Sequence, residues 1–161
     1  MNLTLKFKNI QDCNGLPNIR IVINDAVIFE NTVCPLITLR CGSVHNKITL
    51  RIEHYNKNPV LDTIVENGVI VQDRSCELDT IEVDGYDLEE LKWRSAYHCD
   101  DGTVLDKCLF FGKNGTWHMT FELPVLKWIL QTRHEINNND PDWQEDYESY
   151  VRACKLLNKS I

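Results

Sequence analysis

Short runs of alternating apolar and polar residues fill most of the first 123 positions of this chain. The clearest run spans residues 117–123, where every second residue is apolar. Side chains of a strand point alternately to opposite faces, so each run predicts a strand with one buried face. Shorter runs of the same kind occupy residues 3–7, 19–23, 37–41, 48–52 and 81–83. No strand pattern alternates with a long helical one, as a parallel α/β sheet would require.

Tight-turn dipeptides separate these runs. They are Asn14-Gly15, Asn67-Gly68, Asp84-Gly85, Asp101-Gly102 and Asn114-Gly115, and Asn24-Asp25 offers a further two-residue hairpin turn. Asn, Asp and Gly tolerate the positive φ that such turns need. Many short strands joined in this way favour a β-sandwich or jelly roll. The predicted fold is therefore all-β, with a helix at the C-terminus.

Three segments depart from the strand pattern. Residues 87–93 fit a single helical turn, and residues 125–130 fit either a short helix or a bent strand. Residues 139–161 predict an amphipathic helix with acidic residues near its start. Its apolar stripe, a predicted interface, consists of Trp143, Tyr147, Tyr150, Val151 and Leu157. We therefore divide the chain into a sandwich domain, residues 1–138, and a C-terminal amphipathic helix, residues 139–161.

Composition excludes several classes of partner. The chain carries 24 acidic and 17 basic residues, a formal charge of −7, without a basic cluster. Nucleic acid is therefore not an expected partner. No apolar run approaches the ~18 residues of a membrane span, and no signal peptide is recognisable, so we expect synthesis in the cytosol and no membrane partner. Seven cysteines, an odd number without a C-x-x-C pair, predict free packing thiols.

Catalytic motifs are missing from the sequence. The five histidines lack metal-binding spacing, and neither a nucleophile elbow nor a phosphate-cradling glycine loop occurs. Acidic residues are numerous enough for a paired-carboxylate hydrolase, which stays open as a third possibility. Most of them fit solvated strand faces and turns, so we predict no catalytic residues and no enzyme. Among the aromatic residues, Trp93 and Tyr97 are the rings that we expect to be exposed.

The segment Asp73–Gly85 resembles a signature of calcium-dependent xylan-binding modules, Asp-Arg-Asn-Leu-x-Val-Asp-x-Ile-x-Val-Asn-Gly. The matching residues are Asp73, Arg74, Asp79, Ile81, Val83 and Gly85, whereas Ser75, Cys76 and Leu78 differ. More broadly, residues 48–88 and 112–124 look like small β-sandwich virion structural proteins of tailed phages. Both resemblances imply a sandwich like that of carbohydrate-binding modules.

The resemblance implies two functions. The first is a non-enzymatic virion structural protein at the neck, tail, baseplate or capsid surface, assembled in the host cytoplasm. It would act through contacts with other virion proteins and with its own copies, without a cofactor. The alternative is a calcium-assisted carbohydrate-binding module for attachment to a host surface. For that module, the ligand-binding residues would be Asp62, Asp73, Trp93 and Tyr97, and the calcium ligands Asp62, Glu66 and Asp73.

Overall fold

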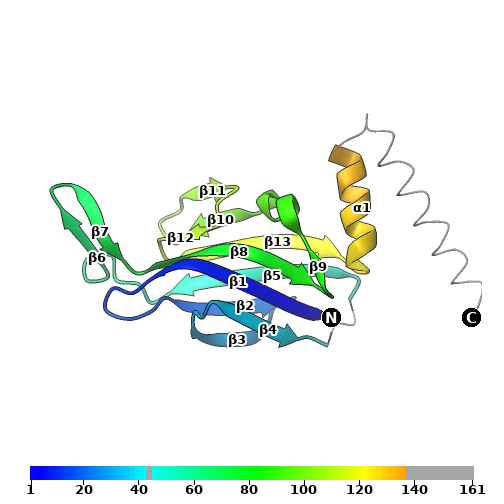
Figure 1. The fold of residues 1–161 in the computed structure, drawn as a ribbon, viewed down its shortest axis with the longest axis horizontal. Helices are drawn as coiled ribbons and strands as arrows, with labels where there is room; N and C mark the ends of the chain where they lie inside the picture. Colours follow the sequence, from blue (N-terminus) through cyan, green and yellow to red (C-terminus); the bar gives the residue numbers. More distant parts are fainter. Residues whose placement is uncertain (43–44, 137–161) are drawn as a thin grey trace, which may run out of the picture.

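The computed structural model describes residues 1–42 and 45–136, which form two β-sheets enclosing one apolar core (Figure 1). The first sheet has the order β12-β8-β1-β4, with β9 beside β8. Its strands are β1 (Asn2–Gln11), β4 (Leu36–Arg40), β8 (Ser75–Val83), β9 (Tyr86–Asp87) and β12 (Phe110–Phe111). The prediction of an all-β sandwich is confirmed.

The second sheet has six antiparallel strands in the order β11-β10-β13-β5-β2-β3. These are β2 (Asn18–Ile23), β3 (Ala26–Thr32), β5 (Lys47–Tyr55), β10 (Ala96–Cys99), β11 (Val104–Asp106) and β13 (Gly115–Glu122). A separate two-stranded sheet, β6 (Thr63–Glu66) and β7 (Val69–Asp73), projects from the end of the sandwich opposite α1 (Val125–Ile136), as Figure 1 shows.

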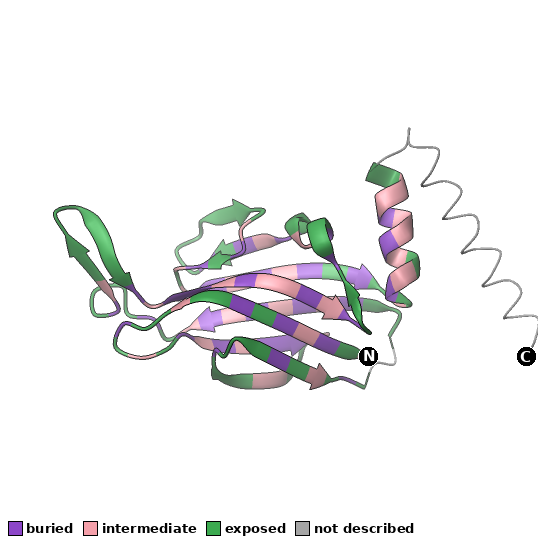
Figure 2. Ribbon diagram, in the orientation of Figure 1, coloured by how far each residue is buried: buried purple, intermediate pink, exposed green. Residues whose placement is uncertain are grey.

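Alternation in the sequence becomes alternation of burial in the strands (Figure 2). In β13, Trp117, Met119 and Phe121 are buried, and His118, Thr120 and Glu122 between them are not. Leu50 and Ile52 of the neighbouring β5 face the same core. At about 25 cal/mol per Å² of apolar surface removed from water, this shared core is the main source of stability.

Four of the five turn dipeptides adopt the expected geometry, since their glycines have positive φ, from +80° to +114°. Asn24 and Asp25 also have positive φ and join β2 to β3 as predicted. The prediction for Asn114-Gly115 is wrong, because Gly115 is the first residue of β13 and pairs with Cys99. A Cβ at Gly115 would lie 2.4 Å from the His98 carbonyl oxygen, so this glycine serves close strand packing.

The segments 87–93 and 125–130 are both helical. The predicted turn at 87–93 is the 3₁₀-helix η1 (Glu89–Arg94), and residues 125–130 belong to α1, which buries Val125 and Ile129. Arg133 of α1 forms ion pairs with Glu89 and Glu90, which ties α1 to η1. Within the described ranges, no helix is long and apolar enough to span a membrane. The predicted helix at 139–161, with its interface residues Trp143, Tyr147, Tyr150, Val151 and Leu157, lies outside those ranges.

Candidate functional site

The projecting hairpin is the most apolar exposed feature of the described chain. We call residues 60–72, which include β6 and most of β7, the apolar arm. It carries seven aliphatic side chains that are 42% to 82% exposed: Val60, Leu61, Ile64, Val65, Val69, Ile70 and Val71. Figure 2 shows the arm exposed along both of its strands. Its one exposed charged residue is Glu66. Exposed aliphatic clusters of this kind mark interaction surfaces.

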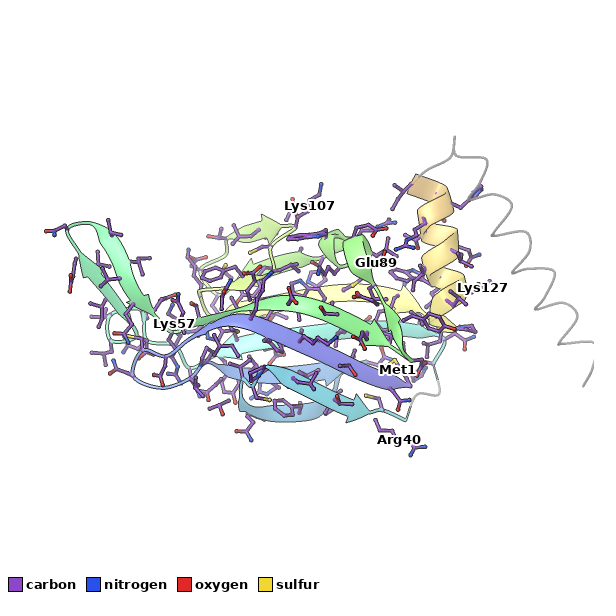
Figure 3. All side chains as sticks on the ribbon, viewed as in Figure 1. Met1, Arg40, Lys57, Glu89, Lys107 and Lys127 are labelled. Atoms are coloured by element: carbon purple, nitrogen blue, oxygen red, sulfur yellow. The ribbon has the colours of Figure 1, made fainter. Side chains whose placement is uncertain are left out.

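A buried ion pair fixes the arm to the sandwich. The Nζ atom of Lys57 lies 2.5 Å from Oδ1 of Asp73, and the two side chains are 5% and 8% exposed. Lys57 Nζ also donates to the carbonyl oxygen of Gly112, and the Thr63 hydroxyl donates to Asp73 Oδ1 at 2.6 Å. Figure 3 labels Lys57 where the hairpin meets the body. The segments that enter and leave the arm are therefore joined in one network.

A second ion pair lies beside the first. Arg74 Nη1 lies 3.1 Å from Oδ2 of Asp62, and the Arg74 backbone N–H donates to the Asp62 carbonyl oxygen. Arg74 Nε donates to the carbonyl oxygen of Leu16 at 2.9 Å, which connects the arm to the loop after β1. The hydrogen bond from the Asn58 backbone N–H has the largest effect on the pKa of Asp62, and the hydrogen bond and charge of Arg74 add to it. Together they hold this pKa below its usual value. We call the pairs Lys57–Asp73 and Asp62–Arg74 the clamp.

A cleft of about 590 Å³ lies between the arm and the loops that flank β10, β11 and β12. Ile70 of the arm, Leu105 and Phe110 supply apolar surface to it. Asp100, Asp101 and Lys113 supply polar groups. The Lys113 ammonium lies 2.8 Å from Asp101 and, with the Thr103 hydrogen bonds, holds the pKa of Asp101 far below its usual value. The cleft can therefore hold a ligand with both apolar and polar faces.

One backbone carbonyl at the cleft accepts hydrogen bonds from two buried side chains. The Lys113 carbonyl oxygen accepts hydrogen bonds from Nδ1 of His54 at 2.8 Å and from the Tyr97 hydroxyl at 2.6 Å. Burial lowers the pKa of His54 and raises the pKa of Tyr97. His54 is therefore neutral near pH 7, with the Nδ1 proton donated to the Lys113 carbonyl oxygen.

The predicted ligand-binding residues lie in two places, the clamp with the adjoining cleft and the helix η1. Asp62 and Asp73 come together in the clamp, and Asp73 and Tyr97 both contribute to the lining of the cleft. Trp93 is exposed as expected, at 42%, but lies on η1 outside the cleft lining. The prediction that Tyr97 is exposed is wrong: the residue is 1% exposed, and its ring stacks on Phe111 with ring centroids 5.2 Å apart. The inward face of β10 carries it into the core.

The structure does not assemble the expected calcium ligands. Asp62 and Asp73 are buried opposite Arg74 and Lys57, and Glu66 lies on the exposed arm. Across residues 1–42 and 45–136, no group of three or more His, Cys, Asp or Glu side chains could hold a metal ion. Asp73 and Asp62 serve the clamp, whereas Glu77 and Asp79 pair with Lys8, and Glu82 pairs with Lys6.

Sequence reasoning missed the apolar arm as a functional feature. The sequence does contain an indication of this arm, because Ile64-Val65 and residues 69–71 are apolar at successive positions. Successive side chains of a strand point to opposite faces, so these residues cannot all lie on one buried face. A run of that kind beside an Asn-Gly turn indicates a hairpin with two apolar faces. Phe110, 48% exposed at the cleft, was likewise missed.

No protein-family model matches the chain, and no curated protein matches it at a significant level. Among solved structures, vCBM60 in complex with galactobiose superposes with a TM-score of 0.49 at 13% sequence identity. The alignment covers 76% of this chain and 98% of that chain.

Proposed function

We propose that this chain is a non-enzymatic structural protein that acts through protein–protein assembly, with the apolar arm as its docking surface. The observation that carries the proposal is the combination of seven exposed aliphatic side chains with a buried clamp at their base. An isolated two-stranded hairpin is marginally stable in water, so a projecting arm that is apolar on both faces favours burial by a partner. The clamp presents it in one orientation and lowers the entropy lost on docking.

The proposed setting is the virion of a tailed phage, at the neck, tail, baseplate or capsid surface. The support for this setting is the resemblance carried by residues 48–88 and 112–124. The partners would be other virion proteins and copies of this chain, assembled in the host cytoplasm. The six cysteines of the described ranges are free thiols, which suits a reducing compartment.

The test is incorporation into particles. Virions purified from cells that produce the chain are analysed by mass spectrometry, and infection is complemented with the wild type or with Val65→Lys. A lysine on an exposed edge strand opposes strand pairing and places a charge in the docking surface. We expect the wild-type chain in the particles and loss of the variant. Absence of the wild-type chain from purified particles would refute the proposal.

A second candidate function rests on the cleft. The exposed Phe110 ring, beside Asp100 and Lys113, offers the apolar face and polar groups with which proteins bind sugars. This candidate is a carbohydrate-binding module for attachment to a host surface. A glycan array with calcium, and again with a chelator, tests it. Phe110→Ala should abolish binding, whereas Trp93→Ala, which removes an exposed ring outside the cleft, should not. An array without binding in either condition removes this candidate.

A further inference from the structure

We infer that the first partner of the apolar arm is a second copy of this chain, with β6 of one copy pairing antiparallel to β6 of the other. The result would be a two-fold dimer with a four-stranded intermolecular sheet. This inference rests on the proposed function and specifies its docking surface. In the described part of the chain, β6 and β7 pair only with each other, so the outer edge of β6 retains unpaired backbone groups. An edge paired with itself in antiparallel orientation gives a closed, isologous contact.

The two edges of the arm are not equivalent. β7 contains an extra residue, since the register shifts between the pairs Ile64↔Gln72 and Val65↔Ile70. A bulge of this kind bends a strand and disrupts further pairing. β6 is regular and contains neither lysine nor proline, the residues that usually block edge pairing. The edge available for pairing is therefore that of β6.

Charge permits contact between two copies at this surface. The whole chain carries −7, so most pairs of surfaces on two copies would repel. On the arm, the charge of Asp62 is matched by Arg74, which leaves Glu66 as the exposed charge. Side chains alternate between the faces of a strand, so a two-fold axis must pass through a residue that pairs with its own copy, and pairing of Ile64 with Ile64 sets Thr63 opposite Val65 of the other copy. The two Glu66 residues then lie four positions apart along the strands, roughly 13 Å, which exceeds one Debye length at physiological salt.

The exposed area is sufficient for a weak to moderate dimer. The seven aliphatic side chains expose an apolar area on the order of several hundred Å². A standard specific interface buries about 800 Å² per partner, and weaker ones bury less. Val65 and Ile70, which are opposite each other in the hairpin, lie on one face of the arm. On the other face, Ile64 would contact Ile64 of the second copy at the two-fold axis. The backbone pairing adds hydrogen bonds to this apolar contact.

Sedimentation equilibrium of the full-length chain over a wide concentration range tests the inference. The key variant is Val65→Lys, and the matched control is Val104→Lys on β11, an equally exposed valine on the edge strand of the six-stranded sheet. We expect a reversible dimer for the wild type and for Val104→Lys. For Val65→Lys we expect a dissociation constant raised about tenfold or more. Thermal melts followed by circular dichroism establish that both variants fold.

A wild type that stays monomeric at the highest concentration would overturn the inference, as would a dimer that Val65→Lys leaves intact. These outcomes are separable from failure of the proposed function. A monomeric wild type that enters particles, with a Val65→Lys variant that does not, refutes the second copy as partner and keeps assembly through the arm. A Val65→Lys variant that still enters particles refutes assembly through the arm itself.

Discussion

Lys57 and Asp73 form a buried ion pair, with Nζ and Oδ1 2.5 Å apart, across the base of a hairpin that exposes its apolar side chains to solvent. Lys57 precedes β6 and Asp73 ends β7, so the pair joins the chain entering the hairpin to the chain leaving it. The neighbouring Asp62–Arg74 pair repeats the arrangement. The hairpin is thereby a fixed extension of the sandwich, in a position suited to docking.

Lys57→Met should destabilise the fold by about 3–5 kcal/mol, because it leaves the Asp73 carboxylate buried without its cation. The double variant Lys57→Met with Asp73→Leu should cost less than the single change, since no unpaired charge remains. Urea denaturation monitored by tryptophan fluorescence measures both free energies of unfolding. Equal stability of Lys57→Met and the wild type would show that the pair contributes nothing to the fold.

Gly115→Ala should cost about 1–3 kcal/mol, because the new Cβ would lie 2.4 Å from the backbone carbonyl oxygen of His98. The matched control is Gly42→Ala, where a Cβ meets no atom within 4 Å. The control should change stability by no more than about 0.5 kcal/mol. Thermal unfolding of the two variants separates close packing of β10 against β13 from a general effect of losing a glycine.

Stability should fall as the pH drops below about 6.5, the ordinary pKa of histidine. Burial lowers the pKa of His54, so the unfolded chain takes up a proton there more readily than the folded chain. His118 acts in the same direction because burial lowers its pKa too. Asp62 contributes to the loss of stability only below pH 3.8, its usual pKa, because its pKa in the folded chain is lower than that value.

His54→Asn retains a hydrogen-bond donor for the Lys113 carbonyl oxygen and removes the titrating group. Between pH 7 and pH 5, its free energy of unfolding should therefore decline less than that of the wild type. Urea denaturation at closely spaced pH values gives both profiles. Parallel profiles for the wild type and His54→Asn would exclude His54 as a source of the acid sensitivity.

Alkylation should distinguish the cysteines by burial. Cys76 is buried, and burial raises its pKa from 9.0 to about 12, which lowers its thiolate fraction at pH 8 about a thousandfold. Cys34 is exposed. Peptide mass spectrometry after iodoacetamide treatment should find Cys34 modified in the native chain and Cys76 modified only in denaturant. Rapid native labelling of Cys76 would contradict its position in the core.

Local rules predict most of the fold. Asn24-Asp25 and Asn67-Gly68 adopt positive φ because small and amide-bearing residues tolerate it wherever they occur. Alternation along β5 and β13 identifies their buried faces without reference to the rest of the chain. Residues 125–130 stayed ambiguous because so short an apolar run fits a helix or a strand equally well. The sequence pattern predicts a turn at Gly115, which is wrong, because a glycine is needed there for close packing against His98 and Cys99 of β10, a different part of the chain.

The site was less predictable because it depends on tertiary contacts. Asp62 and Asp73 stand out in the sequence, yet only the fold shows that Arg74 and Lys57 neutralise them. The inward orientation of Tyr97 depends on which face of β10 meets the other sheet. The apolar residues of the arm resemble those of any buried hairpin, and their exposure follows from the position of β6 and β7 beyond the sandwich.

Hydrogen–deuterium exchange of the full-length chain, free in dilute solution and within purified assemblies, tests the account most directly. If the apolar arm is the docking surface, backbone amides of residues 63–72 should exchange rapidly in the free chain and become protected on assembly. The exposed edge at β11 should exchange at the same rate in both states. Unchanged exchange in the arm, with new protection elsewhere on the sandwich, would contradict the account.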